Sequence, residues 1–336
     1  MTRSQGVRTL CRAGAIALLL QWGIVAGSQI LDHELESQGR LFPEIGPGFR
    51  AIKRDAAGRY YILTAPSAVV QVYDAGGKRT GQIPANPSTN SAILFGEDLD
   101  VDTDGRVYVV DAGANAVKVF DAKGSLMIAI PVARPLSVAA LEMGELAVTS
   151  LKSARLVDVY NLQGKIVRQF GDFVSLADRP DLNRFLNLGR LASDPSGHLY
   201  YAFTYLPEPT VRKYDRLGYA VFEAALTTLE FQPEAQAMRR EIQRQEEHSA
   251  PLSFKPVLRT VGVDPKTLEV WVAMGDRLVE FDRDGNHLIT FRTYAQGSRI
   301  ESLAILLEPG RLLLGDDPQG IYEFARPHAV SQGALF

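Results

Sequence analysis

The chain has 336 residues, with 36 Lys or Arg, 39 Asp or Glu and a formal charge of −3. A composition that is 46% hydrophobic and 22% charged is globular and excludes wholesale disorder, and the near balance of charge disfavours a nucleic-acid binder that works through a broad positive field. The single cysteine excludes a disulfide framework and a cysteine-based zinc site.

Residues 1–28 have the pattern of an export signal. Three arginines lie within the first twelve residues, an apolar stretch runs from Ala13 to Ala26, and small residues follow it. This stretch is shorter than the roughly 20 residues that a bilayer span needs, so we favour cleavage over a retained anchor. We therefore expect a mature chain of residues 29–336 that is periplasmic or extracellular, has no stable membrane span and, without those arginines, carries a charge of −6.

Beyond the start of the mature chain, the sequence repeats. Alternating runs end in Tyr or Phe, followed by Asp or Asn and then by Gly. The closing aromatics are Tyr73, Phe120, Tyr160, Tyr214 and Phe281, and a sixth run ends at Phe324 without the turn. Alternation such as that of Val117 and Val119 around Lys118 is typical of a half-buried strand.

A second landmark precedes each run. Clear Asp-x-x-Gly copies begin at Asp55, Asp102 and Asp194, and degenerate copies lie at 142–144, 264–267 and 308–310. Glycine suits the positive φ of a hairpin turn, and aspartate can accept hydrogen bonds from its own backbone two residues on. Each unit therefore predicts four antiparallel strands, and six units in series predict an all-β fold, a six-bladed β-propeller.

The last unit lacks a fourth strand, and the start of the mature chain offers one. The segment Gly39-Arg40-Leu41-Phe42 is similar to the fourth strands that begin at Gly164 and Gly285. We expect an N-terminal strand at about 39–45 to complete the last blade and so remove an exposed sheet edge.

The second unit carries a family resemblance. Its segments Leu99–Asp111 and Asn115–Gly124 look like an NHL-type repeat, and weaker copies extend over nearly all of the mature chain. The resemblance implies a six-bladed scaffold. NHL-like propellers include protein- and RNA-binding platforms, lyases and lactonase-like enzymes, so the resemblance by itself implies no particular function.

Irregular segments are concentrated on one predicted face. Loops from each fourth strand to the next first strand share a face with the loops between second and third strands, and ligands of propellers usually bind there. The insertions 171–187 and 226–257 and the lengthened loop 206–209 all fall on it. We expect this face to be the contact surface; neutral drift of surface loops is the alternative.

The longer insertion predicts a helix over 233–248, between blades four and five. Pro233 suits a first helical turn, and Pro251 follows the end. Ala235, Met238 and Ile242 form a narrow apolar stripe on an otherwise charged helix. Such a helix could be a lid or a partner surface, or equally a solvated connection.

We expect the residues just before each first strand to lie at the mouth of the central channel. They are Arg50, Glu97, Ser137, Arg190, Arg259 and Glu301. The three arginines could bind an anionic ligand through bidentate hydrogen bonds. The alternative, which we favour, is that these charges pair among themselves.

The signs of an enzyme are weak. No two of the five histidines (His33, His198, His248, His287 and His328) have metal-ligand spacing, and the sequence has no nucleophile elbow or phosphate loop. We predict no catalytic residue, metal or cofactor, and leave catalysis open. The predicted role is a binding or scaffold module for a protein or a small ligand, with no nucleic-acid partner. The alternative is a lactonase-like, divalent-metal-dependent hydrolase or lyase that uses Glu97, Asp98 and Glu301.

Overall fold

The structure is a computed structural model, and it describes residues 33–65, 69–248 and 252–327. The chain divides into two units, Met1–Leu31 and Asp32–Phe336, and the architecture below is that of the second. The expected export signal lies outside the described residues. Within the described part, no helix is both long enough and apolar enough to cross a membrane.

Four separate antiparallel sheets make up the first two thirds of this unit, each from four consecutive strands. They are β2 (Phe49–Arg54), β3 (Tyr60–Thr64), β4 (Val70–Tyr73) and β5 (Arg79–Ile83); β6 (Gly96–Val101), β7 (Val107–Asp111), β8 (Ala116–Phe120) and β9 (Leu126–Pro131); β10 (Pro135–Ala140), β11 (Leu146–Ser150), β12 (Val157–Tyr160) and β13 (Ile166–Phe170); and β14 (Gly189–Ser193), β15 (Leu199–Phe203), β16 (Thr210–Tyr214) and β17 (Ala220–Ala225). The predicted alternating runs are the third strands, and their closing aromatics are buried.

The remaining strands form one nine-stranded sheet. Its strands are β18 (Thr260–Val263), β19 (Val270–Met274), β20 (Arg277–Phe281), β21 (His287–Ala295), β22 (Ser298–Arg299), β23 (Ala304–Glu308), β24 (Arg311–Asp316), β25 (Gly320–Ala325) and β1 (His33–Leu41). The order is β18-β19-β20-β21-β1-β25-β24-β23, with β22 beside β21.

Strand β1 joins the two halves of this sheet. Its first residues, from His33 to Glu36, run parallel to β21, and its last residues, from Ser37 to Leu41, run antiparallel to β25. The strand beside β25 therefore begins and ends earlier than the expected range 39–45. It ends where Phe42 takes a φ of +51°, outside the extended region.

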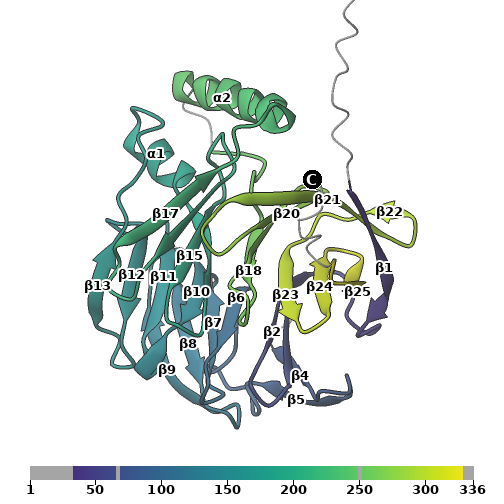
Figure 1. Cartoon of the computed structure of the whole chain (residues 1–336). Helices are drawn as coiled ribbons and strands as arrows, with labels where there is room; N and C mark the ends of the chain where they lie inside the picture. Colours follow the sequence, from purple (N-terminus) through teal and green to yellow (C-terminus); the bar gives the residue numbers. More distant parts are fainter. Residues whose placement is uncertain (1–32, 66–68, 249–251, 328–336) are drawn as a thin grey trace, which may run out of the picture. The chain divides into compact units, whose positions relative to one another are not determined.

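The first strands of the sheets surround a central axis. Strands β2, β6, β10, β14, β18 and β23 each contact the next, and β23 contacts β2, so the circle is closed (Figure 1). Later strands of each sheet lie farther out, and those such as β13 and β17 carry exposed side chains. Four-stranded antiparallel sheets arranged in this way make a β-propeller.

The core lies between neighbouring sheets. Phe49, Tyr60 and Tyr73 of the first sheet pack with Leu313 and Ile321 of the last strands, and five similar clusters occupy the rest of the described part. A fully buried apolar side chain of this size contributes roughly 1.5–3 kcal/mol. These side chains fill the space between sheets, and the channel wall is formed by residues on or next to the first strands.

The Asp-x-x-Gly landmarks are the turns between first and second strands. Gly105 has a φ of +78°, in the left-handed region that favours glycine. Asp102 accepts the N–H groups of Asp104 and Arg106, each at 2.9 Å, and the Tyr108 hydroxyl at 2.8 Å. Asp55 and Asp194 make equivalent bonds. These aspartates are therefore explained by turn geometry.

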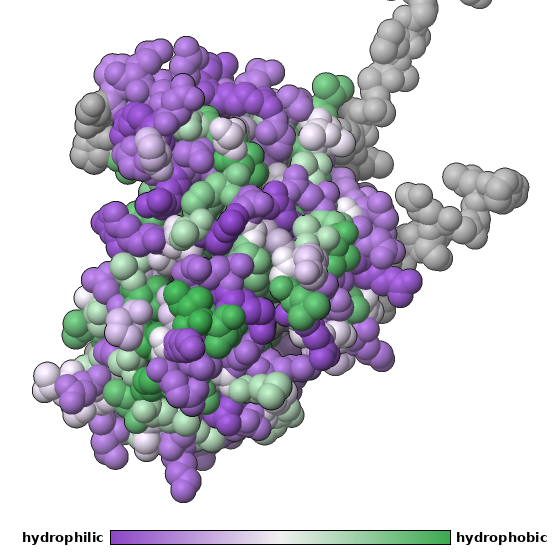
Figure 2. All heavy atoms as spheres, turned by 90° about the vertical axis from the view of Figure 1, so that its left-hand side faces the viewer, coloured by the Kyte–Doolittle hydropathy of each residue, from purple (hydrophilic) through white to green (hydrophobic). Residues whose placement is uncertain are grey.

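Two helices lie in the insertions. Helix α2 (Gln232–Glu247) confirms the predicted helix, one residue earlier, and its stripe of Ala235, Met238 and Ile242 is buried. Helix α1 (Pro180–Leu186) was not predicted. The other helical segments of the described residues are the single turns η1 (Glu142–Gly144) and η2 (Leu229–Phe231). Figure 2 shows a mostly hydrophilic surface over the helices and more apolar side chains over the outer strands below them.

The two insertions hold each other in place. The Arg179 guanidinium donates to the carbonyl oxygens of Gln245 at 2.7 Å and His248 at 2.8 Å, and its backbone N–H donates to Glu246 at 2.8 Å. Arg239 of α2 pairs with Glu208 of the lengthened loop. The three irregular segments therefore form one connected rim.

Candidate functional site

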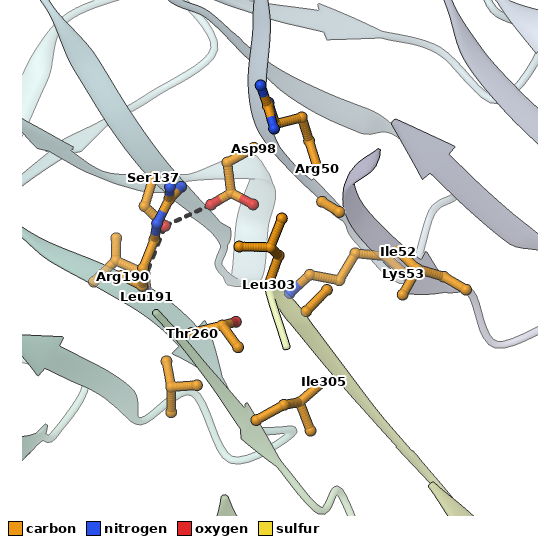
Figure 3. Close-up of a pocket in the computed structure, with 13 residues that line it drawn as sticks. Arg50, Ile52, Lys53, Asp98, Ser137, Arg190, Leu191, Thr260, Leu303 and Ile305 are labelled. Carbon is orange, nitrogen blue, oxygen red and sulfur yellow. Dashed lines mark hydrogen bonds between the residues drawn. The ribbon is translucent and has the colours of Figure 1, made fainter. Parts of the chain in front are cut away.

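The centre of the propeller has one polar side and one apolar side. Lys53 of β2, Asp98 of β6 and Arg190 of β14 line it on the polar side, and Ile305 of β23 lines it on the other (Figure 3). Val261 of β18 also lines this space. The first strand of each sheet supplies these side chains because alternate residues of an inner strand face the axis. A ligand at the axis would therefore meet an asymmetric wall.

Asp98 and Ser137 link three sheets across the polar side. The Ser137 hydroxyl donates to the Asp98 carboxylate at 2.5 Å and accepts the N–H of Leu191 at 3.0 Å (Figure 3). Burial raises the pKa of Asp98, although the charges of Arg190 and Lys53 and the Ser137 hydrogen bond partly oppose it. Ser137 is fully buried, and its hydroxyl group both donates and accepts a hydrogen bond. It therefore connects the sheets and is not an exposed nucleophile.

Four of the six predicted mouth residues pair among themselves. Arg190 donates to Glu97 at 2.8 Å and to the Leu136 carbonyl at 3.0 Å. Arg259 pairs with Glu301. Arg190 and Glu97 belong to β14 and β6 of two separate sheets, on either side of β10, whereas Arg259 and Glu301 precede β18 and β23, two neighbouring first strands of the nine-stranded sheet.

Arg50 pairs with a residue outside the six predicted at the mouth. Its guanidinium lies 3.5 Å from Asp317, in the turn between β24 and β25. Arg50, Ser137 and Arg190 line the same central space, whereas Glu301 lines a separate groove beside α2. Three of the six predicted residues thus line the central space and one lines the groove, whereas Glu97 and Arg259 line neither.

The channel is nearly closed at its centre. The space lined by Arg50, Asp98 and Arg190 measures about 20 Å³, which is room for about one water molecule. Lys53, Val261 and Ile305 line both this space and the wider cavity on the turn side, so the two meet at these side chains. A ligand larger than water therefore has to bind at one end or the other.

The wider cavity, of about 600 Å³, is lined by the Asp-x-x-Gly turns, on the face opposite to the one that the sequence favoured. Its carboxylates already have partners: Asp100 lies 3.3 Å from Lys53, and Glu308 pairs with Arg54 and Arg311. Sequence reasoning missed this cavity, although the recurring turn aspartates mark its rim.

Three aromatic side chains meet on the helix-bearing face. Phe185 of α1 stacks on Tyr205 with ring centroids 4.6 Å apart, and Phe254 lies 5.7 Å from Phe185. All three are partly exposed. Burial raises the pKa of Tyr205, partly opposed by the charge of Arg190, and the charge of Glu97 raises it further.

A short loop adds an apolar edge to the same face. Leu94 and Phe95 are exposed, and the Arg50 guanidinium lies 5.9 Å from the centre of the Phe95 ring. The backbone N–H groups of Leu94 and Phe95 donate to the buried Asp111 carboxylate at 3.0 and 2.9 Å. The loop is therefore held by backbone hydrogen bonds, and the exposed side chains of Leu94 and Phe95 are available to contact a partner.

The geometry of a metal site is not found in the described part of the chain, where no three His, Cys, Asp or Glu side chains are grouped as ligands. Of the suggested carboxylates, Glu97 accepts from Arg190, Asp98 from Ser137, and Glu301 from Arg259. Oxygen atoms engaged in this way would have to release their partners before they could coordinate a cation.

The fold and this face define a β-propeller with inserted helices at one end of its channel. Among solved structures, streptogramin B lyase is similar, with a TM-score of 0.52 and 13% identity over 83% of this chain and 94% of its own. Virginiamycin B lyase from Staphylococcus aureus has a TM-score of 0.53 and 13% identity over 88% and 99%. A catalytically inactive histidine-to-alanine variant of the latter, with quinupristin, has a TM-score of 0.53 and 10% identity over 86% and 98%.

At these identities the likeness is one of fold alone. No protein-family description matches the chain, and no curated protein matches it.

Proposed function

We propose that this chain is a binding module that contacts a protein or a small ligand through its helix-bearing face. The observation that carries the proposal is the partly exposed cluster of Phe185, Tyr205 and Phe254. The two insertions and the loop between β15 and β16 each contribute one of these rings. Aromatic side chains supply much of the contact energy in interfaces because they bury a large area with few rotatable bonds.

Several features of the architecture belong to the same proposal. We infer six blades, the last two merged by β1, because six first strands form the closed circle. The relation to NHL repeats and the export of the mature chain to the periplasm or beyond remain proposals that rest on the sequence. Because the mature chain would carry a net negative charge, we propose no nucleic-acid partner.

Catalysis has less support than binding. The lyase neighbours share only the fold, and none of the described histidines (His33, His198, His248 and His287) lines the channel spaces or the groove beside α2. The metal-dependent alternative lacks a specific observation in its favour. We therefore propose the binding role alone.

The test is capture from a cell-envelope extract with three forms of the protein. The unchanged chain identifies the captured molecule, a Phe95→Ser/Tyr205→Ala variant alters the proposed face, and Met143→Ser alters a side chain that is 99% exposed on the opposite face. We expect the first variant to lose about tenfold in affinity for that molecule and Met143→Ser to keep it. Equal affinity of all three forms, with unchanged melting temperatures, contradicts the proposal.

A further inference from the structure

A groove of about 380 Å³ lies between α2 and the turn that joins β19 to β20. Its apolar lining comes from Ala237 and Met238 of α2, Val257 of the following segment, and Met274 at the end of β19. This volume lies within the range of small-molecule sites. Methionine side chains are unbranched and polarisable, so they adapt to apolar ligands of varied shape.

Among the side chains that line this groove, carboxylates outnumber cations. Glu234, Glu241, Asp276 and Glu301 line it, and only Lys255 and Arg277 oppose them. The carboxylate side chains are between 24% and 44% exposed, so each retains oxygen surface that a ligand can reach. Hydrogen bonds from Arg244 and Gln245 lower the pKa of Glu241 to about 2, so this group is ionised at neutral pH.

The side chains of Arg277 and Lys255 differ in how firmly their neighbours hold them. Arg277 is held by Glu234 at 3.5 Å, by the Glu230 carbonyl at 3.4 Å and by the Phe231 ring, whose centre is 5.7 Å away. Lys255 is 74% exposed and lies 3.7 Å from Glu301, a distance typical of a weak surface pair. A ligand cation could replace Lys255 at Glu301 at little cost.

Other arginines stand beside these carboxylates without lining the groove. Arg244 bonds to Glu241, Arg292 and Arg299 lie 3.5 and 3.1 Å from Asp276, and Arg259 pairs with Glu301. They fix the carboxylates in place, as the supporting residues of a preorganised site do. The side chains that face the groove itself still carry an excess of negative charge.

We propose that this groove binds a small lipophilic cation, with its apolar part against Met238, Val257 and Met274 and its positive charge near Glu241 and Glu301. The proposal deepens the proposed function, because the groove belongs to the same helix-bearing face. An anion of the same shape would meet four carboxylates and should be rejected.

The test uses two ions of nearly identical shape and opposite charge, tetraphenylphosphonium and tetraphenylborate, titrated calorimetrically into the full chain. We expect the cation to bind and the anion to bind at least about tenfold more weakly. Equal binding of the two ions, or no binding of the cation at about 1 mM, overturns the proposal.

Matched variants locate the site. Ala237 lines the groove and its neighbour Gln236 does not, and both are exposed positions of α2. Ala237→Trp should weaken tetraphenylphosphonium binding about tenfold, Glu241→Gln about threefold, and Gln236→Trp less than about twofold. Equal losses with the two tryptophan substitutions contradict the location.

The two proposals fail in different ways. In one outcome, tetraphenylphosphonium binding depends on Ala237 and Glu241, but capture is unaffected by the Phe95 and Tyr205 substitutions. This result would refute the wider proposed function and support the groove. Capture that depends on Phe95 and Tyr205, without binding of the cation, would refute the groove alone.

Discussion

Asp111 and Lys118 form a buried ion pair beneath the helix-bearing face. The Asp111 carboxylate lies 2.8 Å from the Lys118 amine, and both side chains are almost fully buried. Burial by itself would raise the pKa of Asp111, but the hydrogen bonds from Lys118 and from the N–H groups of Phe95 and Leu94 outweigh it and leave the pKa below its usual value. The ionised carboxylate thus holds the exposed loop.

Removing one member of this pair should be costly. Asp111→Ala leaves the Lys118 amine buried without its counter-charge, and we expect a loss of about 3–5 kcal/mol in the free energy of unfolding. The double variant Asp111→Ala/Lys118→Met should recover part of this loss, since it removes the stranded charge as well. Urea unfolding measures both, and a double variant no more stable than Asp111→Ala would count against the account.

Glu280 on β20 makes stability depend on pH. Its side chain is buried, and burial together with the charge of Glu269 raises its pKa to about 7, opposed in part by Arg326. The unfolded chain has the ordinary value of 4.5. Between these two values the folded protein holds a proton that the unfolded chain releases, so stability falls as the pH rises through this window.

Replacement of Glu280 by glutamine should remove that dependence. Between about pH 4.5 and pH 8, the unchanged chain should lose up to about 3 kcal/mol more stability than Glu280→Gln. Glu36→Gln, at an exposed position of β1, is the control and should behave as the unchanged chain. Parallel pH profiles of melting temperature for the unchanged chain and Glu280→Gln would refute the role of this carboxyl.

At the scale of elements, β1 is the strand with the largest expected effect on stability. It pairs with β21 and β25 at once and buries Leu35, so its removal exposes two sheet edges together. Deletion of residues 29–45 should therefore lower the melting temperature sharply. Deletion of residues 1–28 alone is the control, and a melting temperature unaffected by the longer deletion would contradict the closing role.

The repeated strands could be predicted because each carries two local signals. The turn glycines and closing aromatics recur in fixed order, and turn geometry and burial explain both. The pairing of β1 with β21 could not be predicted, because it joins residues more than 250 positions apart without any sequence pattern. Helix α1 is only seven residues long, too short for a periodic signal.

The candidate site was predictable only in outline. Irregular segments indicated the face of the proposed contact, and the alternative that the mouth charges pair among themselves agrees with Arg190–Glu97 and Arg259–Glu301. Phe185, Tyr205 and Phe254 lie far apart in the sequence and share no spacing, so only the folded chain brings their rings together. The groove beside α2 likewise depends on how the helix packs.

The whole molecule has a channel that is nearly closed at its centre, and we propose that partners bind at its helix-bearing end. Site-specific photo-crosslinking tests it most directly, with benzoylphenylalanine introduced in place of Tyr205 on this face or in place of Met143 on the opposite face, in a cell-envelope extract. We expect a discrete crosslinked product from position 205 and none from position 143. Crosslinks that form from position 143 and not from position 205 would contradict it.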